Sequence, residues 1–355
     1  MGSFERPRRN LPTVSVVLSF LNSRRTIAQC LSSLAEQNYP MELFDVVVVD
    51  GGSTDGSALV CEQMRLRFKN LRLMPMPGCT EPEGQIAGVE SSGGEVVMFT
   101  NSDIYVPSDW ISRHVRWLMS GFDLVGGRVF WGGDKYAFTW NVPIPDRPQY
   151  EQQPGMGLGF SNCSVRRRDF TEVGGIAKLQ SQHDTEFALR MVKRGRRLIL
   201  DPKIEVYHDH PLKSLGGSFR RSYGYARNHV IVSRSVYGRP VPGSRRTTRL
   251  FLRSAIREFA LVNSLVVYRE LEPEARRHGI DVGLFEFIFI RLVSTKLGQA
   301  FGILAGVVAP RVSRSSLADL HAQRGPEVEH FVEPPQAASH RTENPRPAAR
   351  GSQTK

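Results

Sequence analysis

Phe44–Asp50 (FDVVVVD), followed by Gly51–Asp55 (GGSTD), decides the fold. The nearly continuous apolar run is typical of a strand that is buried on both faces. After the Gly/Ser/Thr turn, apolar residues recur at helical spacing. Similar runs lie at Val14–Leu18, Leu71–Leu73 and Glu95–Thr100, each separated from the next by a helical pattern. Strands that alternate with helices predict an α/β fold, with a mainly parallel sheet flanked by helices.

Polar side chains gather where three of these strands end. The clusters are Ser19–Asn22, Asp50–Asp55 and Asn101–Asp103. Open parallel sheets bind ligands beyond the carboxyl ends of their strands. We therefore expect the three clusters to lie at one site.

The cluster after the second strand begins with Asp50 and two glycines, a pattern that suits recognition of a nucleotide. A carboxylate at a strand end accepts hydrogen bonds from a base or a ribose, and glycines let the backbone approach the ligand closely. Taken alone, the same residues fit an ordinary turn in which Ser53 caps the next helix.

The second pattern, Asn101-Ser102-Asp103, suits a divalent cation that neutralises a departing diphosphate. Mg²⁺ and Mn²⁺ prefer oxygen ligands, and Asp103 is the candidate anchor. A solvated Asx-turn explains the same residues equally well in isolation.

Two further patterns lie beyond the predicted parallel strands. Asp184 falls in the first turn of a predicted helix, where the helix dipole keeps a carboxylate in its basic form. Such a group can take a proton from an acceptor hydroxyl, although plain N-capping explains it too. His208 and His210 lie on one face of an extended segment and offer a late metal ligand or a phosphate donor.

The charge of the chain is unevenly distributed. Lys and Arg outnumber Asp and Glu by 47 to 35, which gives a net charge of +12. Residues 211–257 contain eleven Lys or Arg and no Asp or Glu. This stretch predicts an anionic partner, and it adjoins two hydrophobic, helical segments at 250–271 and 282–309. We expect association with an anionic membrane surface, with the 282–309 segment either lying in the interface, which we favour, or crossing the membrane as a tilted span. A helical packing domain with solvated arginines is the alternative.

The remaining features bound the class of protein. The four cysteines, Cys30, Cys61, Cys79 and Cys163, show no zinc spacing and predict reduced thiols in the cytosol. The first eleven residues lack the apolar core of a secretory signal. From Arg311 onward the composition predicts a disordered tail.

Together and in this order, the motifs resemble glycosyltransferase family 2, whose members have the GT-A fold. The resemblance covers about residues 13–239 and includes Gly157–Ser164 (GLGFSNCS), which is similar to the acceptor-side segment of the family. It implies a domain at 13–240, between a flexible N-terminus at 1–12 and a membrane-associated helical region at 241–310, followed by a tail at 311–355.

The resemblance also implies an activity and a set of roles. The expected reaction is transfer of a sugar, with inversion, from a UDP-sugar to a lipid-linked or saccharide acceptor of envelope or exported polysaccharide synthesis, at the cytoplasmic face of the membrane. Asp184 would be the catalytic base. Donor binding falls to Ser19, Asn22, Asp50, Ser53, Asn101, Asp103, Arg220 and Arg221. Asp103 and His208 would hold Mg²⁺ or Mn²⁺.

Two departures from the family pattern keep a rival interpretation open. Asn101 stands where the metal motif usually has its first Asp, and His183 stands where an acidic residue often precedes the catalytic Asp. The rival is a catalytically inactive nucleotide-sugar-binding scaffold of a polysaccharide assembly. A nucleic-acid-binding protein is ranked well below both, because it leaves the ordered carboxylates unexplained.

Overall fold

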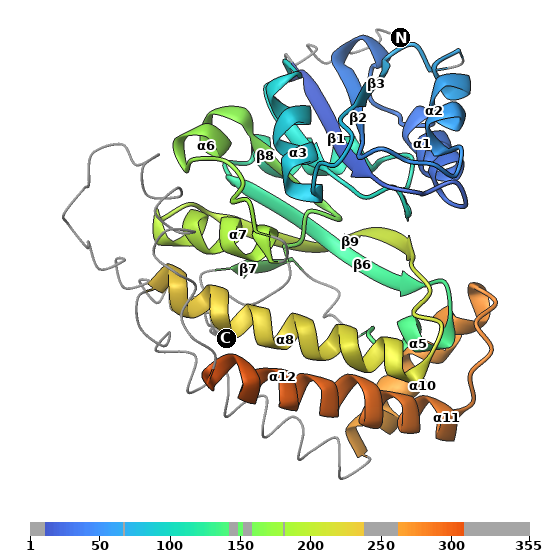
Figure 1. The fold of residues 1–355 in the computed structure, drawn as a ribbon. Helices are drawn as coiled ribbons and strands as arrows, with labels where there is room; N and C mark the ends of the chain where they lie inside the picture. Colours follow the sequence, from blue (N-terminus) through green and yellow to red (C-terminus); the bar gives the residue numbers. More distant parts are fainter. Residues whose placement is uncertain are drawn as a thin grey trace, which may run out of the picture.

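The computed structural model describes residues 11–66, 68–141, 148–151, 158–179, 182–237 and 262–308. The predicted flexible N-terminus therefore lies almost entirely outside the described residues, as does the predicted disordered tail. Within the described residues, one curled sheet of nine strands forms the centre, with the order β3-β2-β1-β4-β8-β6-β9-β5 and with β7 paired to β9 (Figure 1).

The first half of the sheet is parallel, as the sequence predicts. It consists of β1 (Val14–Phe20), β2 (Phe44–Asp50), β3 (Leu71–Pro75) and β4 (Val96–Phe99). All three ladders between these strands are parallel, and Phe20 lies opposite Asp50 in the β1–β2 ladder. The carboxyl ends of β1, β2 and β4 therefore meet at one edge.

The second half of the sheet departs from the parallel pattern. It consists of β5 (Ile104–Tyr105), β6 (Leu124–Gly132), β7 (Gln149–Glu151), β8 (Cys163–Arg166) and β9 (Leu198–Asp209). β8 pairs antiparallel with both β4 and β6, and β9 is parallel to β6 but antiparallel to β5 and β7. The sheet as a whole is thus mixed. β7 lies between two stretches, 142–147 and 152–157, that are outside the described residues.

The two faces of the parallel half follow the side-chain alternation of β1. Val16 and Leu18 point into a core that includes α1 (Ile27–Ala35), α2 (Ser57–Arg65) and α4 (Trp110–Met119). Val17 points to the other face, which packs against α3 (Glu81–Glu90), α6 (Arg167–Glu172) and α7 (His183–Lys193). Helices on both faces explain why these strands are apolar throughout.

The C-terminal helices extend the molecule beyond the sheet. They are α8 (Leu215–Tyr237), α10 (Val262–Arg277), α11 (Leu284–Ile290), the π-helix η2 (Arg291–Lys296) and α12 (Leu297–Val308). α8 and α12 run alongside each other below the sheet (Figure 1). α10 and α11 share a third core with β6 and the short α5 (Lys135–Phe138), in which Phe138 packs against both Phe130 and Phe287, and Phe287 packs against Tyr268.

The helix from Leu284 to Gly306 has the length and hydropathy to cross a membrane. Its mean hydropathy is 1.4, but 44% of its most apolar window is buried inside the protein. A buried helix of a soluble protein meets the same criteria. This helix confirms an apolar C-terminal extension and is weak evidence for membrane association.

Candidate functional site

Hydrogen bonds join the loops that follow β1, β2 and β4. Asn22 donates its N–H to Ser53 Oγ and accepts from Thr54 N–H through Oδ1, each at 2.9 Å. Ser23 connects the same loop to the loop after β4, with its Oγ 2.7 Å from Ser102 Oγ. Asn22 has a φ of 53°, and asparagine tolerates this left-handed conformation better than most residues. The three polar clusters predicted from the sequence thus form one scaffold.

Asp50 is buried at the centre of this scaffold. Its Oδ1 accepts from the N–H of Ser53 at 2.9 Å and from Ser53 Oγ at 2.6 Å. No hydrogen bond from the described residues reaches Oδ2. Asp50 therefore shapes the turn through one oxygen, while the other accepts no hydrogen bond from the described residues. Ser19 lies beside it, against Gly84, where a Cβ would overlap Ser19 Oγ.

Asn101 and Asp103 follow β4 and face different partners. Asn101 donates through Nδ2 to Ser161 Oγ at 3.2 Å, which links it to the predicted acceptor-side segment. Asp103 turns to the end of β9, and its carbonyl accepts from Asp209 N–H at 2.8 Å. The antiparallel pairing of β5 with β9 holds the two segments in this register.

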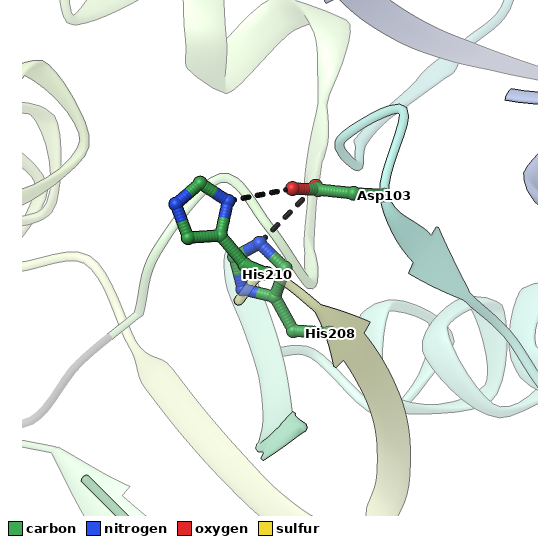
Figure 2. A group of neighbouring side chains, drawn as sticks. All are labelled: Asp103, His208 and His210. Atoms are coloured by element: carbon green, nitrogen blue, oxygen red, sulfur yellow. Dashed lines mark hydrogen bonds and ion pairs between the residues drawn. The ribbon is translucent and has the colours of Figure 1, made fainter. Parts of the chain in front are cut away.

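Asp103, His208 and His210 form a compact group of metal-ligand type (Figure 2). Asp103 Oδ1 lies 3.1 Å from His208 Nε2, and Asp103 Oδ2 lies 2.9 Å from His210 Nδ1. One ligand atom from each residue falls within 4.8 Å of the others. Figure 2 shows both rings directed at the same carboxylate, which is the arrangement that a shared cation needs.

Burial and hydrogen bonds within the group shift the pKa values of its members. Burial raises the pKa of Asp103, but hydrogen bonds from His208 and His210 outweigh this effect and hold the pKa well below its ordinary value. Burial lowers the pKa of His208, whose Nδ1 is buried without a hydrogen-bond partner in the described part of the chain. His208 also packs on Trp131, with 4.4 Å between the ring centroids. Asp103 is thus ionised and His208 neutral, the states that bind cations.

Arg221 of α8 reaches the same group from below the sheet. Its Nη1 lies 2.7 Å from His210 Nε2. The guanidinium also lies over three rings, 5.1 Å from Trp131, 5.8 Å from Trp140 and 5.4 Å from Tyr225. Such cation–π contacts hold a charged group in place without neutralising it. The neighbouring Arg220 is exposed, and no hydrogen bond or ion pair joins it to the group within the described ranges.

Asp184 lies in the first turn of α7, as predicted, and adjoins the acceptor-side segment. Its Oδ1 accepts from the N–H of Thr185 at 2.7 Å. Its Oδ2 lies against Gly159, where an added Cβ would sit 3.2 Å from this oxygen. Only a residue without a side chain leaves this side of the carboxylate open.

Glu81, which we did not single out from the sequence, connects Asp184 with the Asp103 group. Glu81 is an exposed residue, and His183, Asp184, Asp103 and Arg221 all act on its carboxylate electrostatically. It begins α3, whose capping box pairs Thr80 with Glu83. The pattern Thr80-x-x-Glu83 marks this helix start in the sequence. His210 was noticed only as one of a pair, and its contact with Asp103 depends on the β5–β9 pairing.

Comparisons with known proteins identify the family of the chain. The model described as "Glycosyl transferase family 2" matches residues 15–174. Glycosyltransferase AglE of Haloferax volcanii is 34% identical over 238 residues, which are 62% of this chain and 74% of the relative. The chain belongs to glycosyltransferase family 2. It is therefore a glycosyltransferase by family.

Two solved structures share the fold of this family 2 glycosyltransferase. The mannosyltransferase PcManGT of Pyrobaculum calidifontis, in complex with GDP-Man and Mn²⁺, has a TM-score of 0.55 at 17% identity, covering 82% of this chain and 87% of that chain. S. aureus TarS 1-349, in complex with UDP-GlcNAc, has a TM-score of 0.50 at 16% identity, covering 82% and 91%. At these identities the likeness establishes the GT-A fold and no more.

A third similarity covers only a short segment. Poly(ribitol-phosphate) beta-N-acetylglucosaminyltransferase TarS of Staphylococcus aureus strain Mu50 is 35% identical over 94 residues. These are 26% of this chain, and they span only 16% of that relative, far less than two thirds of its length. Its substrates therefore say nothing about this chain directly.

Proposed function

We propose that the chain transfers a sugar from a UDP-sugar to a hydroxyl of a lipid-linked or saccharide acceptor, with inversion at the anomeric carbon. The observation that carries the proposal is the convergence of Asp103, His208 and His210 beside Arg221. Asp184, which lies beside Gly159, provides the second part of the site. One end of this site suits a diphosphate, because it combines a cation site with a guanidinium. The other end offers a carboxylate that can take a proton.

The donor occupies the strand tips in this proposal. The Oδ2 of Asp50 accepts an N–H of the base, and the loop of Asn22 and Ser53 lies against the nucleoside. The GT-A fold supports this placement, because ligands of such sheets bind beyond the carboxyl ends of the parallel strands. We favour UDP over other nucleotides because the motif at Asp50 resembles that of the family.

The donor set of the metal group fits a divalent cation. Two imidazoles and one carboxylate meet at 4.8 Å or less, and each neutral histidine can offer a lone pair to a cation from the nitrogen that faces Asp103 once its proton sits on the other ring nitrogen. Imidazole ligands suit Mn²⁺ better than Mg²⁺, which prefers oxygen, so we favour Mn²⁺ of the two ions. Bound there, the ion supplies charge that stabilises the departing diphosphate.

The chemical step needs one base from the protein. Asp184 takes the proton of the acceptor hydroxyl, the oxygen attacks the anomeric carbon, and the bond from that carbon to the phosphate oxygen breaks as the diphosphate departs with its electron pair. Attack from the face opposite the leaving group gives inversion. Arg221 adds positive charge on the leaving side, and Gly159 leaves room for the acceptor beside Asp184.

We place the enzyme at the cytoplasmic face of the membrane, in the synthesis of an envelope or exported polysaccharide. The acid-free, Arg-rich stretch 211–257 favours an anionic surface. A lipid-linked acceptor would be presented at such a surface. The four thiols are unpaired, with three of them buried, which fits a reducing compartment.

An inactive nucleotide-sugar-binding scaffold is the second candidate. It is favoured by Asn101, whose amide is turned towards Ser161 and supplies no charge to a cation. The two candidates differ in turnover. A scaffold binds donor but neither hydrolyses nor transfers it.

A thermal-shift panel of nucleotide-sugars, with and without Mn²⁺ or Mg²⁺, tests donor binding, because a ligand of the folded state raises its stability. We expect a UDP-sugar with Mn²⁺ to give the largest shift, and chelation to remove it. Donor hydrolysis by wild type and Asp184→Asn then separates the candidates. Donor binding without hydrolysis or transfer by the wild type would leave only the scaffold, whereas equal, measurable rates in both proteins would remove Asp184 from the mechanism.

A further inference from the structure

The C-terminal helix of residues 284–308 has one face fixed against the protein. Gly298, Gly302 and Gly306 lie so close to α8 that a Cβ on any of them would overlap the backbone carbonyls of Phe219, Tyr223 and Arg227. Small residues at this spacing let two helices approach backbone to backbone. Further along, Arg291 is 2% exposed and donates to the carbonyls of Thr139 and Asn141 at 2.6 and 2.9 Å.

The opposite face of the same helix exposes large apolar side chains. Phe285 is 86% exposed, Phe289 56%, Phe301 54% and Leu304 63%. We call these four residues the outer face. They are among the most exposed large apolar side chains in the described residues, and exposed apolar side chains that gather on one element mark a candidate interaction site.

The π-helix η2 is what places the four residues on one side. Over the 16 positions from Phe285 to Phe301, an uninterrupted α-helix at about 100° per residue would end roughly 160° away. The wider turn of Arg291–Lys296 rotates less per residue, so Phe301 and Leu304 fall back towards the side of Phe285 and Phe289. The same turn keeps the glycines aimed at α8. A π-turn inside a helix commonly marks a functional position.

The attachment to α8 decides between lying on a membrane and crossing one. To span a bilayer, the helix would have to leave α8 and expose Arg291 and its carbonyl partners to hydrocarbon, or carry α8 into the bilayer with it. α8 holds Arg221 in the site, so neither arrangement is compatible with the structure. The outer face alone can enter an interface while the rest stays in water.

Charge favours a lipid surface over other partners. α8 carries the exposed Arg220 directly after Phe219, whose ring lies 6.4 Å from that of Phe301. The chain from 211 to 257, which includes α8, has eleven basic residues and no acidic one. Phe and Leu beside Arg is the composition of helices that lie in the headgroup region of anionic bilayers.

We propose that Phe285, Phe289, Phe301 and Leu304 insert into the cytoplasmic leaflet of an anionic membrane, with the 284–308 helix parallel to its surface. The inference rests on the proposed membrane location of the acceptor and names the face that docks. In this orientation Arg220 binds headgroup phosphates, while the next residue, Arg221, contacts His210 in the site. The site then lies one helix layer from the lipid, about 8–10 Å between helix axes, within reach of a lipid-linked acceptor.

The test compares the full-length wild type with a variant that carries Phe285→Gln, Phe289→Gln, Phe301→Gln and Leu304→Gln together. A matched control carries Leu59→Gln and Leu66→Gln, which change side chains that are 61% and 84% exposed on or next to α2. Flotation with vesicles of phosphatidylcholine plus phosphatidylglycerol measures binding. We expect the outer-face variant to lose roughly tenfold or more in partitioning, and the control to match wild type.

Two further measurements make the result decisive. Donor binding, followed as the thermal shift given by the best nucleotide-sugar in the absence of vesicles, should be unchanged in the variant. If no nucleotide-sugar raised the unfolding temperature of the wild type, that result would count against the proposed function. The outcome of the flotation experiment would not depend on it. Light scattering without vesicles measures the oligomeric state, and therefore shows whether a second copy of the chain covers the outer face.

Two outcomes would overturn the docking proposal. Equal flotation of variant and wild type would mean that the Arg-rich stretch binds vesicles without the outer face. A wild-type dimer that becomes monomeric in the variant, with no vesicle binding by either, would assign the face to contact between copies of the chain.

Discussion

The Nε2 of His210 lies 2.7 Å from Nη1 of Arg221. An arginine can only donate hydrogen bonds, so Nε2 is the acceptor and the proton of the neutral ring sits on Nδ1. That proton is donated to Asp103 Oδ2 at 2.9 Å. A metal ion at Nδ1 requires the other tautomer, whose Nε2–H would face an N–H of Arg221. The hydrogen bond from Arg221 and a metal ion at Nδ1 therefore require opposite tautomers of the His210 ring.

From this competition we predict that Arg221→Met binds Mn²⁺ more tightly than wild type when no donor is present. The expected gain is about tenfold, the equivalent of one hydrogen bond of roughly 1.4 kcal/mol. Isothermal titration of the donor-free protein with Mn²⁺ measures it. Sugar transfer by the same variant should fall, because a positive charge near the diphosphate is lost.

Arg220→Met is the matched control for Arg221→Met, since it removes the same charge from a side chain outside the group. If both variants gained equally in Mn²⁺ affinity, general electrostatics would explain the effect. An unchanged affinity of Arg221→Met would show that the Arg221–His210 hydrogen bond does not restrain the ring.

For Asp184→Asn we predict a loss of about 10²–10⁴ in the rate of transfer, the usual contribution of a general base. Asparagine keeps the shape of the side chain and can still accept from the N–H of Thr185. Donor affinity should therefore stay within a factor of about two, because Asp50 and the Asp103 group are unchanged. Single-turnover kinetics with saturating donor measure the step. A rate close to that of wild type would remove Asp184 from the mechanism.

The parallel half of the fold was predictable because local signals carry it. Apolar runs such as Val46–Val49 end abruptly in polar residues, so both the strands and the position of the site follow from the sequence. The antiparallel half was less accessible. β8 pairs with β4, although more than sixty residues lie between Val97 and its partner Val165, and no local pattern records such a pairing.

The site could be predicted in part for the same reason. Asp50, Asp103 and Asp184 stand at ends of elements, where a sequence pattern points to them. His210 and Arg221 acquire their contacts only through the β5–β9 pairing and the position of α8. The α8 helix itself was missed because Gly216, Gly217 and Gly224 lower its helix propensity. Its stability comes from packing against α12.

A buried histidine behind the site should make the stability depend on pH. His114 is fully buried and bonds Ser164 Oγ at 2.9 Å and Asn162 Oδ1 at 3.0 Å. Burial lowers its pKa to about 4, although the hydrogen bond that His114 donates to Asn162 Oδ1 partly opposes the effect. In the unfolded chain the pKa returns to about 6.5, so the unfolded state binds more protons between these values.

We therefore predict that the free energy of unfolding falls as pH drops from 7 to 4, with His114 contributing roughly 3 kcal/mol of the fall. Replacing His114 by Gln keeps a polar group in the network and removes this titration. Denaturant unfolding of both proteins at pH 7 and pH 4 gives the difference. Parallel pH dependence in the two proteins would mean that other groups dominate acid sensitivity.

The backbone contact between α8 and α12 gives the last prediction. A Cβ at Gly302 would overlap the carbonyl of Tyr223 and lie 3.0 Å from both the Cβ of Ala226 and the N of Arg227. Since helix backbones cannot yield locally, Gly302→Ala should push the helices apart and lower the free energy of unfolding by about 1–3 kcal/mol.

Gly224 lies on the same pair of helices, but a Cβ there would meet nothing within 4 Å. Gly224→Ala should accordingly stabilise the protein by about 0.5–1 kcal/mol, because alanine loses less backbone entropy in a helix. Opposite signs for the two substitutions in thermal unfolding would locate the contact between α8 and α12. If Gly302→Ala were as stabilising as Gly224→Ala, the helix of the outer face would be free to leave α8, and the argument against a membrane-spanning helix would lose its basis.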